Sequence, residues 1–128
     1  MPADAARCRE ELQQLLASEQ RLLGAIEQLL ESEYAAVAAN DIESLEARSA
    51  QRSQYLSELL RVQEARHRLL QMQGLPAGLE GLRQLTRVCD PAGDLQSRFA
   101  ECAKRANHCR ELNERNRLLV AARLRRVT

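Results

Sequence analysis

The sequence is dominated by apolar residues that recur every three or four positions, which is the pattern of long amphipathic helices. The clearest stretch runs from Leu95 to Val127, without an internal glycine or proline. It predicts one helix roughly 50 Å long. Steps of four and three, a repeat typical of coiled-coil seams, select ten positions, seven of them apolar: Leu95, Phe99, Cys102, Ala106, Cys109, Asn113, Asn116, Val120, Arg123 and Val127. A single helix cannot bury this stripe alone, so it needs partner helices along its length.

The first part of the chain predicts two such partners. Apolar spacing of three and four predicts a first helix over about residues 3–39 and a second over about residues 42–73. Asn40 and Glu43 resemble a capping box between them, and Asp41 could also cap the second helix. One unbroken rod would leave its seam uncovered, so two antiparallel helices are favoured.

The second helix has the more polar seam. Half of its positions are polar, which predicts thinner packing between Ser49 and Arg52. Gly74 followed by Leu75-Pro76 is a strong stop signal. The seam comprises Ile42, Leu45, Ser49, Arg52, Leu56, Leu59, Gln63, Arg66, Leu70 and Gln73.

A connector over residues 75–93 retains helical spacing at Leu79, Leu82, Leu85 and Val88, which predicts one short helix that must dock on the bundle to persist. Asp90-Pro91 then opens the last helix, over about residues 94–127. We therefore expect residues 1–128 to form a single all-α domain. Its predicted architecture is an elongated, antiparallel, coiled-coil-like three-helix bundle with a short extra helix in the second connection.

Composition supports long, thin helix packing, because aromatic residues are only 2% and charged residues 29%. Charge is uneven: residues 1–64 carry 12 acidic and 6 basic side chains, whereas residues 103–128 carry 8 basic and 2 acidic ones. A basic last helix packed against an acidic first helix explains this most simply. A basic tail that binds nucleic acid is the alternative. No aromatic residue lies among these arginines to stack on bases, which counts against it.

No stretch has the length and apolar character of a membrane span, and the N-terminus lacks the layout of a signal peptide. The four cysteines form no C-x-x-C pair, and we expect buried, reduced thiols in a cytoplasmic protein. His108 and Cys109 point in different directions on a helix and lack further ligands, so no metal or cofactor is expected. Phosphate-binding loops and nucleophile motifs are also lacking, which favours a protein that is not an enzyme.

The end of the last helix carries more apolar surface than one packing seam requires. An amphipathic partner helix could bury the excess; a homodimer seam or a wider contact within the bundle are the alternatives. The amides of Asn113 and Asn116 either fix the register of a buried seam or bond to a bound segment. The candidate partner-binding residues are Leu112, Asn113, Asn116, Leu119, Val120, Leu124 and Val127.

Motifs in both halves resemble those of the FlgN family of flagellar export chaperones, over roughly residues 12–120. Arg117 stands where the family usually has glycine. The resemblance rests on Leu29-Leu30-Glu31-Ser32-Glu33-Tyr34, Asp41-Ile42-Glu43-Ser44-Leu45, Arg66 with Leu69-Leu70 and Gly74, and Cys109-x-x-Leu112-Asn113-x-x-Asn116-x-Leu118-Leu119.

This resemblance implies a cytoplasmic chaperone that binds the C-terminal helical segments of the hook–filament junction proteins FlgK and FlgL through its own C-terminal part. Such a chaperone prevents premature assembly and presents its substrates to the flagellar type III export apparatus. The alternative from another class is a coiled-coil scaffold that self-associates through the same surface.

Overall fold

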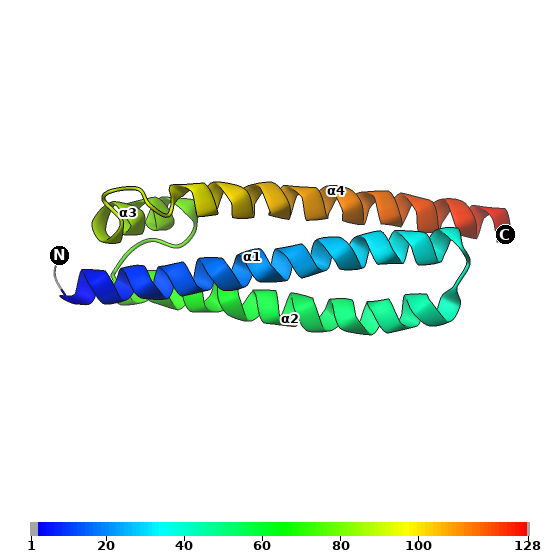
Figure 1. The fold of residues 1–128 in the computed structure, drawn as a ribbon, viewed down its shortest axis with the longest axis horizontal. Helices are drawn as coiled ribbons and strands as arrows, with labels where there is room; N and C mark the ends of the chain where they lie inside the picture. The colour runs from blue at the N-terminus through cyan, green and yellow to red at the C-terminus, as the bar shows by residue number, and fades with distance from the viewer. Residues whose placement is uncertain (1–2, 128) are drawn as a thin grey trace.

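The chain forms a long rod of helices. The computed structural model describes the backbone of residues 3–127 and the side chains of residues 4–126. In that part there is no strand, and the predicted all-helical fold is confirmed (Figure 1). The short helix expected in the connector is present, so the described chain has four helices: α1 (Ala3–Ala38), α2 (Ile42–Met72), α3 (Leu79–Cys89) and α4 (Gln96–Val127).

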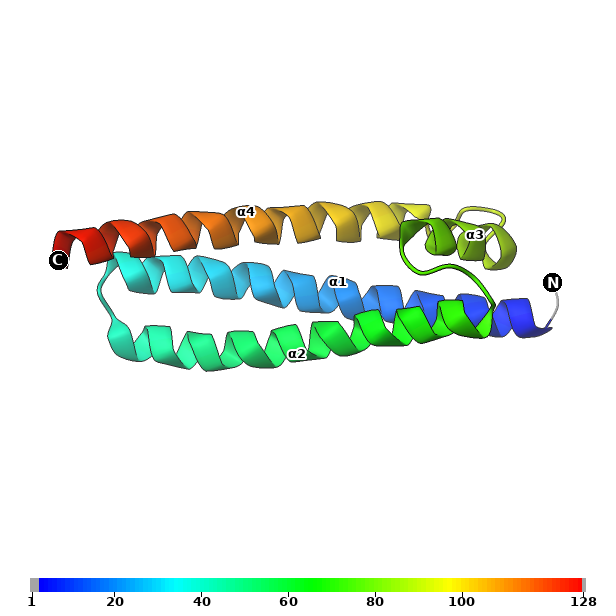
Figure 2. The ribbon, with the colours of Figure 1, turned by 180° about the vertical axis from the view of Figure 1, so that it is seen from behind.

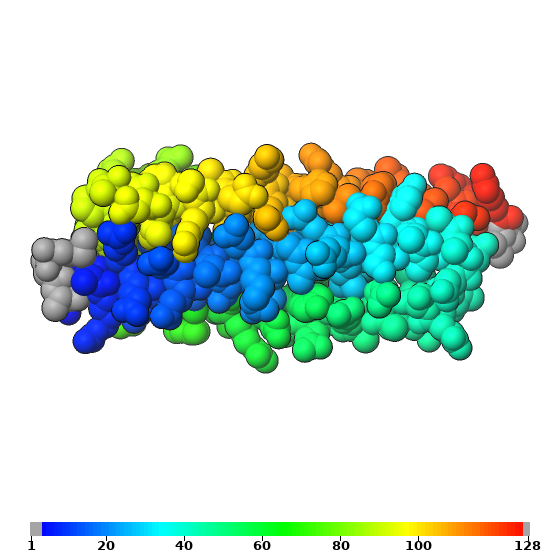
Figure 3. All heavy atoms as spheres, viewed as in Figure 1, coloured from blue at the N-terminus to red at the C-terminus, as the bar shows by residue number. Residues whose placement is uncertain are grey.

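The central helix is α1, which contacts α2, α3 and α4. By contrast, no Cα atom of α2 lies within 8 Å of one in α4 anywhere in residues 3–127. Figures 1 and 2 show that α2 runs antiparallel to α1, whereas α4 runs in the same direction as α1. On the face drawn in Figure 3, α1 lies between α4 and α2. The expected antiparallel arrangement therefore holds between consecutive long helices, and the α1–α4 pair is parallel.

The α1–α4 interface is built on a row of small hydrogen-bond donors. The Sγ atoms of Cys102 and Cys109 donate to the carbonyl oxygens of Leu16 and Leu23, at 3.8 and 3.6 Å. One heptad further on, Nδ2 of Asn116 donates to the carbonyl oxygen of Leu30 at 2.8 Å. Each pair is separated by the same 86 residues, as a parallel register requires. Short side chains in this row also let the two helices approach closely.

The predicted seam of α4 changes along the helix. Leu95 and Phe99 are buried or half-buried, as expected, but Asn113 is exposed and Leu112 is buried in its place. Near its start α4 packs on α1 and lies beside α3: Phe99 and α3 residues line one small cavity, although no Cα atoms of α3 and α4 lie within 8 Å of each other in residues 3–127. Beyond α3 only α1 remains as a close neighbour. Asn113 and Val120, which lie on the same face of α4 as Phe99 but further along the helix, are therefore exposed.

Two polar residues in the seam of α2 form ion pairs with α1. Arg66 pairs with Glu19 at 2.8 Å and Arg52 with Glu33 at 3.5 Å, both across the α1–α2 interface. The two pairs lie two heptads apart on each helix, so they repeat one geometry and fix the antiparallel register. Glu33 is buried, and its charge is compensated by Arg52.

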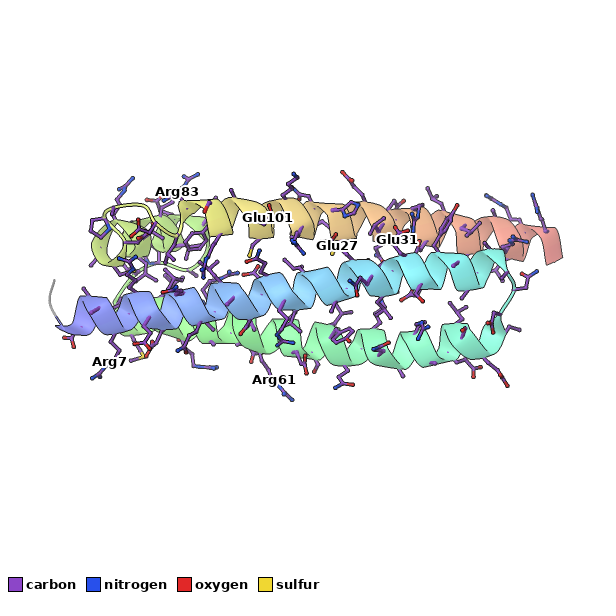
Figure 4. The ribbon with its side chains drawn as sticks, viewed as in Figure 1. Arg7, Glu27, Glu31, Arg61, Arg83 and Glu101 are labelled. Carbon is purple, nitrogen blue, oxygen red and sulfur yellow. The ribbon has the colours of Figure 1, made fainter. Side chains whose placement is uncertain are left out.

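Further ion pairs join α1 to α4, as the charge distribution indicated. Glu27 lies 3.0 Å from His108 and 3.9 Å from Arg105, and Glu31 lies 3.0 Å from Arg115. Figure 4 shows Glu27 and Glu31 on the side of α1 next to α4. The basic partner in each pair is a third or more exposed, so each pair contributes at most about 1 kcal/mol. Together they favour the basic helix as the neighbour of the acidic one.

Helix ends follow local rules. Asp41 caps α2, since its Oδ1 accepts from the Ser44 N–H at 3.2 Å. The end of α2 is confirmed as a Schellman motif: Gly74 has a φ of 69°, and the Leu75 N–H donates to the Leu70 carbonyl at 3.0 Å. Gly81 packs α3 tightly on the connector, because a Cβ there would lie 1.7 Å from the Pro76 carbonyl oxygen.

Asp90 was expected to cap the last helix directly before its first residue, but α4 begins six residues later, at Gln96. Asp90 lies buried at the end of α3, and its carboxylate accepts from the Asp94 N–H at 3.1 Å and the Leu95 N–H at 2.9 Å. The turn over 91–95 is thereby held in place, and α4 begins only at Gln96. Asp90 thus couples the end of α3 to the start of α4.

We predict that Asp90→Ala destabilises the protein by about 1–3 kcal/mol, because it leaves a buried backbone N–H without its acceptor. Urea unfolding followed by circular dichroism measures this loss. Asp94→Asn is the matched control: it removes a solvated pair with Arg9 and should cost less than about 1 kcal/mol. Equal losses for the two variants would contradict the assigned role of Asp90.

We also predict that stability falls at alkaline pH. Burial raises the pKa of Cys89 and of Cys109 to about 11 from the ordinary 9.0. The folded state therefore holds these protons more tightly than the unfolded chain. Their contribution is fully present below about pH 9 and is lost as the pH rises to about 11. Between about pH 9 and pH 11, the melting temperature should fall less for the double variant Cys89→Ala/Cys109→Ala than for the wild type. An equal fall for the two proteins would contradict this role of the two thiols.

Candidate functional site: an apolar groove beside the α1–α2 turn

An apolar groove lies at the end of the rod where α1 turns into α2 and α4 ends. Its volume is about 440 Å³. Three helices supply its walls, which explains its position: α1 and α4 end here side by side, and α2 starts without approaching α4. The lining residues are Ala36, Val37, Asn40, Asp41, Ile42, Leu45, Val120, Arg123 and Leu124.

Large apolar side chains remain accessible around this groove. Val120 is 38% exposed, Leu124 60% and Ile42 69%. Val37 and Ala36 are buried and form the floor. Exposed apolar side chains that converge from two helices over a buried apolar floor are a feature of protein-binding surfaces, and an amphipathic helix is the shape that fits a groove between helices.

Arg123 fixes the end of α4 at the groove. Its Nη2 donates to the carbonyl oxygen of Ala38 at 2.9 Å, next to the point where α1 ends. A cation at this carbonyl also suits the negative end of the α1 dipole. This hydrogen bond holds the end of α4, and with it Val120 and Leu124, beside the end of α1.

The structure divides the predicted site residues into two layers. Val120 and Leu124 line the groove, and Asn113 is exposed two turns before Val120. Leu112 and Asn116 are buried against α1, and Leu119 is half-buried. The side chain of Val127 lies outside the described residues.

The two asparagines have different environments. Asn116 is occupied within the chain: its Nδ2 donates to the Leu30 carbonyl, and its Oδ1 accepts from Nε and Nη2 of Arg115 at 3.3 and 3.2 Å. Asn113 is exposed and its Oδ1 accepts from Nη2 of Arg52 on α2. This hydrogen bond crosses the space between α2 and α4, at the inner end of the groove.

Sequence reasoning missed the wall that α2 supplies. Ile42 and Leu45 were assigned to the packing seam of the second helix, yet Ile42 is exposed and both line the groove. The signal was available in the seam itself, because its positions between Leu45 and Leu56 are polar and offer little to pack against a neighbouring helix. Apolar residues isolated at the start of such a seam indicate a surface.

Disulfides, groups of metal-binding side chains and membrane-spanning helices are all lacking among the described residues. All four cysteines are free thiols. No group of three or more His, Cys, Asp or Glu side chains that could hold a metal ion exists among the residues with described positions. Within residues 3–127, no helix has the length and apolar character needed to span a membrane.

Comparison with known proteins agrees with the motifs in both halves. The FlgN protein family matches residues 8–128, nearly the whole chain. No curated protein and no solved structure matches it. The family match includes every helix that forms the groove, from the first turns of α1 to the end of α4. The chain therefore belongs to the FlgN family, whose members are chaperones of flagellum biogenesis.

Proposed function

We propose that this protein binds the C-terminal helical segments of the hook–filament junction proteins FlgK and FlgL in the cytoplasm. Bound segments cannot assemble prematurely, and the chaperone presents them to the flagellar type III export apparatus. Membership of the FlgN family supports the general role. The apolar groove between α1, α2 and α4 is the observation that carries the proposal.

The groove supplies what a chaperone of this kind needs. An amphipathic segment that is unfolded when free gains helical structure by covering Val120, Leu124 and Ile42. Leu112, Asn116 and Leu119 act as the layer beneath, which keeps α4 against α1 so that the exposed residues hold their positions. A typical specific interface of this kind covers about 800 Å² per partner. This function is binding alone and needs no catalytic group, so we propose that the protein is not an enzyme.

We predict that Val120→Asp weakens binding of a peptide covering the FlgK C-terminal helix at least about tenfold, because an apolar contact is lost and a carboxylate must give up its water when the peptide covers it. Isothermal titration calorimetry measures the affinity, and circular dichroism should show an unchanged fold, since Val120 lies at the surface.

Leu118→Asp is the matched control for this variant. Leu118 is 53% exposed on the same helix but points away from the groove, two residues from Val120. Its affinity for the peptide should stay at the wild-type value. If Val120→Asp binds both the FlgK and the FlgL peptide as tightly as the wild type, the groove is not the binding site.

Self-association through the groove is the competing function, and light scattering separates the two. A chaperone should give an equimolar complex with the peptide and a mass that does not depend on protein concentration when free. A scaffold should form oligomers without peptide, and Val120→Asp should dissolve them.

A further inference from the structure

Helix α3 shows how a helix packs between α2 and α4. It lies on α1 near the start of the molecule (Figure 2). On one side, Leu79 and Leu82 line a cavity together with Gln63 and His67 of α2. On the other side, Leu82 lines a cavity together with Phe99 of α4. This 11-residue helix thus fills one end of the space that separates α2 from α4.

The faces that α3 covers continue uncovered beyond it. Seven residues are about two helical turns, so residues one heptad apart lie on the same face. On α2, Leu70 is buried beside α3 at 3% exposure, and steps of seven lead from it through the exposed Gln63 to Leu56. The same step leads from the exposed His67 to Leu60, and Leu56 and Leu60 are 47% and 55% exposed.

The same step on α4 leads from Phe99 through Ala106 and Asn113 to Val120. Of these, Phe99 and Ala106 are half-buried, and Asn113 and Val120 are exposed. Both walls of the groove beside the α1–α2 turn therefore extend along the rod as far as α3.

A polar cluster lies midway along this extended groove. Arg52 donates to Asn113 across the groove and pairs with Glu33 on its floor. Glu33 is buried, and its Oε1 has no hydrogen-bond partner among the described residues. An arginine has five N–H donors, so Arg52 can hold a further acceptor. Apolar residues thus lie on either side of a polar centre.

We infer that one amphipathic helix of an export substrate binds along the whole groove, in line with α3, with α2 as its second wall. This inference rests on the proposed function. From Ile42 to Leu60 the groove is roughly 27 Å long, the length of about 18 helical residues. The occupant carries apolar residues towards both ends and a carboxylate or amide side chain at its centre, facing Arg52.

The observation that selects this occupant is continuity with α3. The chain already places an amphipathic helix on the same faces of α2 and α4, and the substrate helix completes that layer. Leu56, Leu60 and Val120 are then covered as Leu70 of α2 and, in part, Phe99 of α4 are covered beside α3. The bound state is a four-helix rod along its full length.

Photo-crosslinking tests this path. A benzophenone amino acid is introduced at Leu60 or Val120, with Met72 of α2 and Leu118 of α4 as exposed control positions, and the full chain is irradiated with the FlgK C-terminal peptide. Leu60 and Val120 should both cross-link to the peptide, and the controls should not. Cross-linking from Val120 without Leu60 would overturn the extended path and leave the proposed function intact. Failure at both positions, with the FlgL peptide as well, would remove both.

A binding measurement provides the second arm. The double variant Leu56→Asp/Leu60→Asp should weaken the peptide at least about tenfold. Its control, Gln54→Asp/Ser57→Asp, adds two acidic residues to the outward face of the same helix and should bind normally. Equal affinities for the two double variants would overturn the inference. Chaperone-to-chaperone cross-links from Leu60 without peptide would show a second copy as the occupant, which also overturns it.

Discussion

The parallel packing of α4 on α1 is the constraint on which the remaining structure depends. Cys102, Cys109 and Asn116 donate to successive carbonyl oxygens of α1 at intervals of one heptad. These donors define one register, since a shift by a single residue would move all of them away from their acceptors. Their small size lets the helices pack closely.

Because α1 is bound on two sides, α2 and α4 remain apart. In the middle of the rod, the residues that face the intervening space are polar: Ser49 and Arg52 on α2 and Asn113 on α4. Arg52 and Asn113 meet there through a hydrogen bond and not through apolar packing. Cavities lie between α3 and its neighbours α2 and α4 at one end of the rod, and the apolar groove lies between α2 and α4 at the other end.

This separation of α2 and α4 links the fold to the role of the family. A chaperone of a segment that later assembles elsewhere must hold it without enclosing it. The proposed groove meets that need: Val37 and Ala36 form its buried floor, and a helix bound there would keep one face in solvent. In the inferred path, the buried Glu33 with its partner Arg52 adds a polar centre that would favour some apolar helices over others.

The sequence by itself determined the helices, because capping and stop signals are local. Apolar spacing predicted their extents closely, Gly74 predicted the end of α2, and the uneven charge indicated that the basic helix packs on the acidic one. It also marked the surplus of apolar residues near Val120 and Leu124.

Only the tertiary structure decided which predicted seams are packed and which are open. Periodicity reports that a face is apolar, but not which neighbour covers it. Asn113 and Phe99 occupy equivalent heptad positions, yet only Phe99 lies beside α3. Glu33 could likewise be solvated or buried until Arg52 was placed opposite it. The same reason applies to the groove wall formed by Ile42 and Leu45. This wall is open because α2 and α4 lie apart on either side of α1, and no local pattern in the sequence predicts that separation.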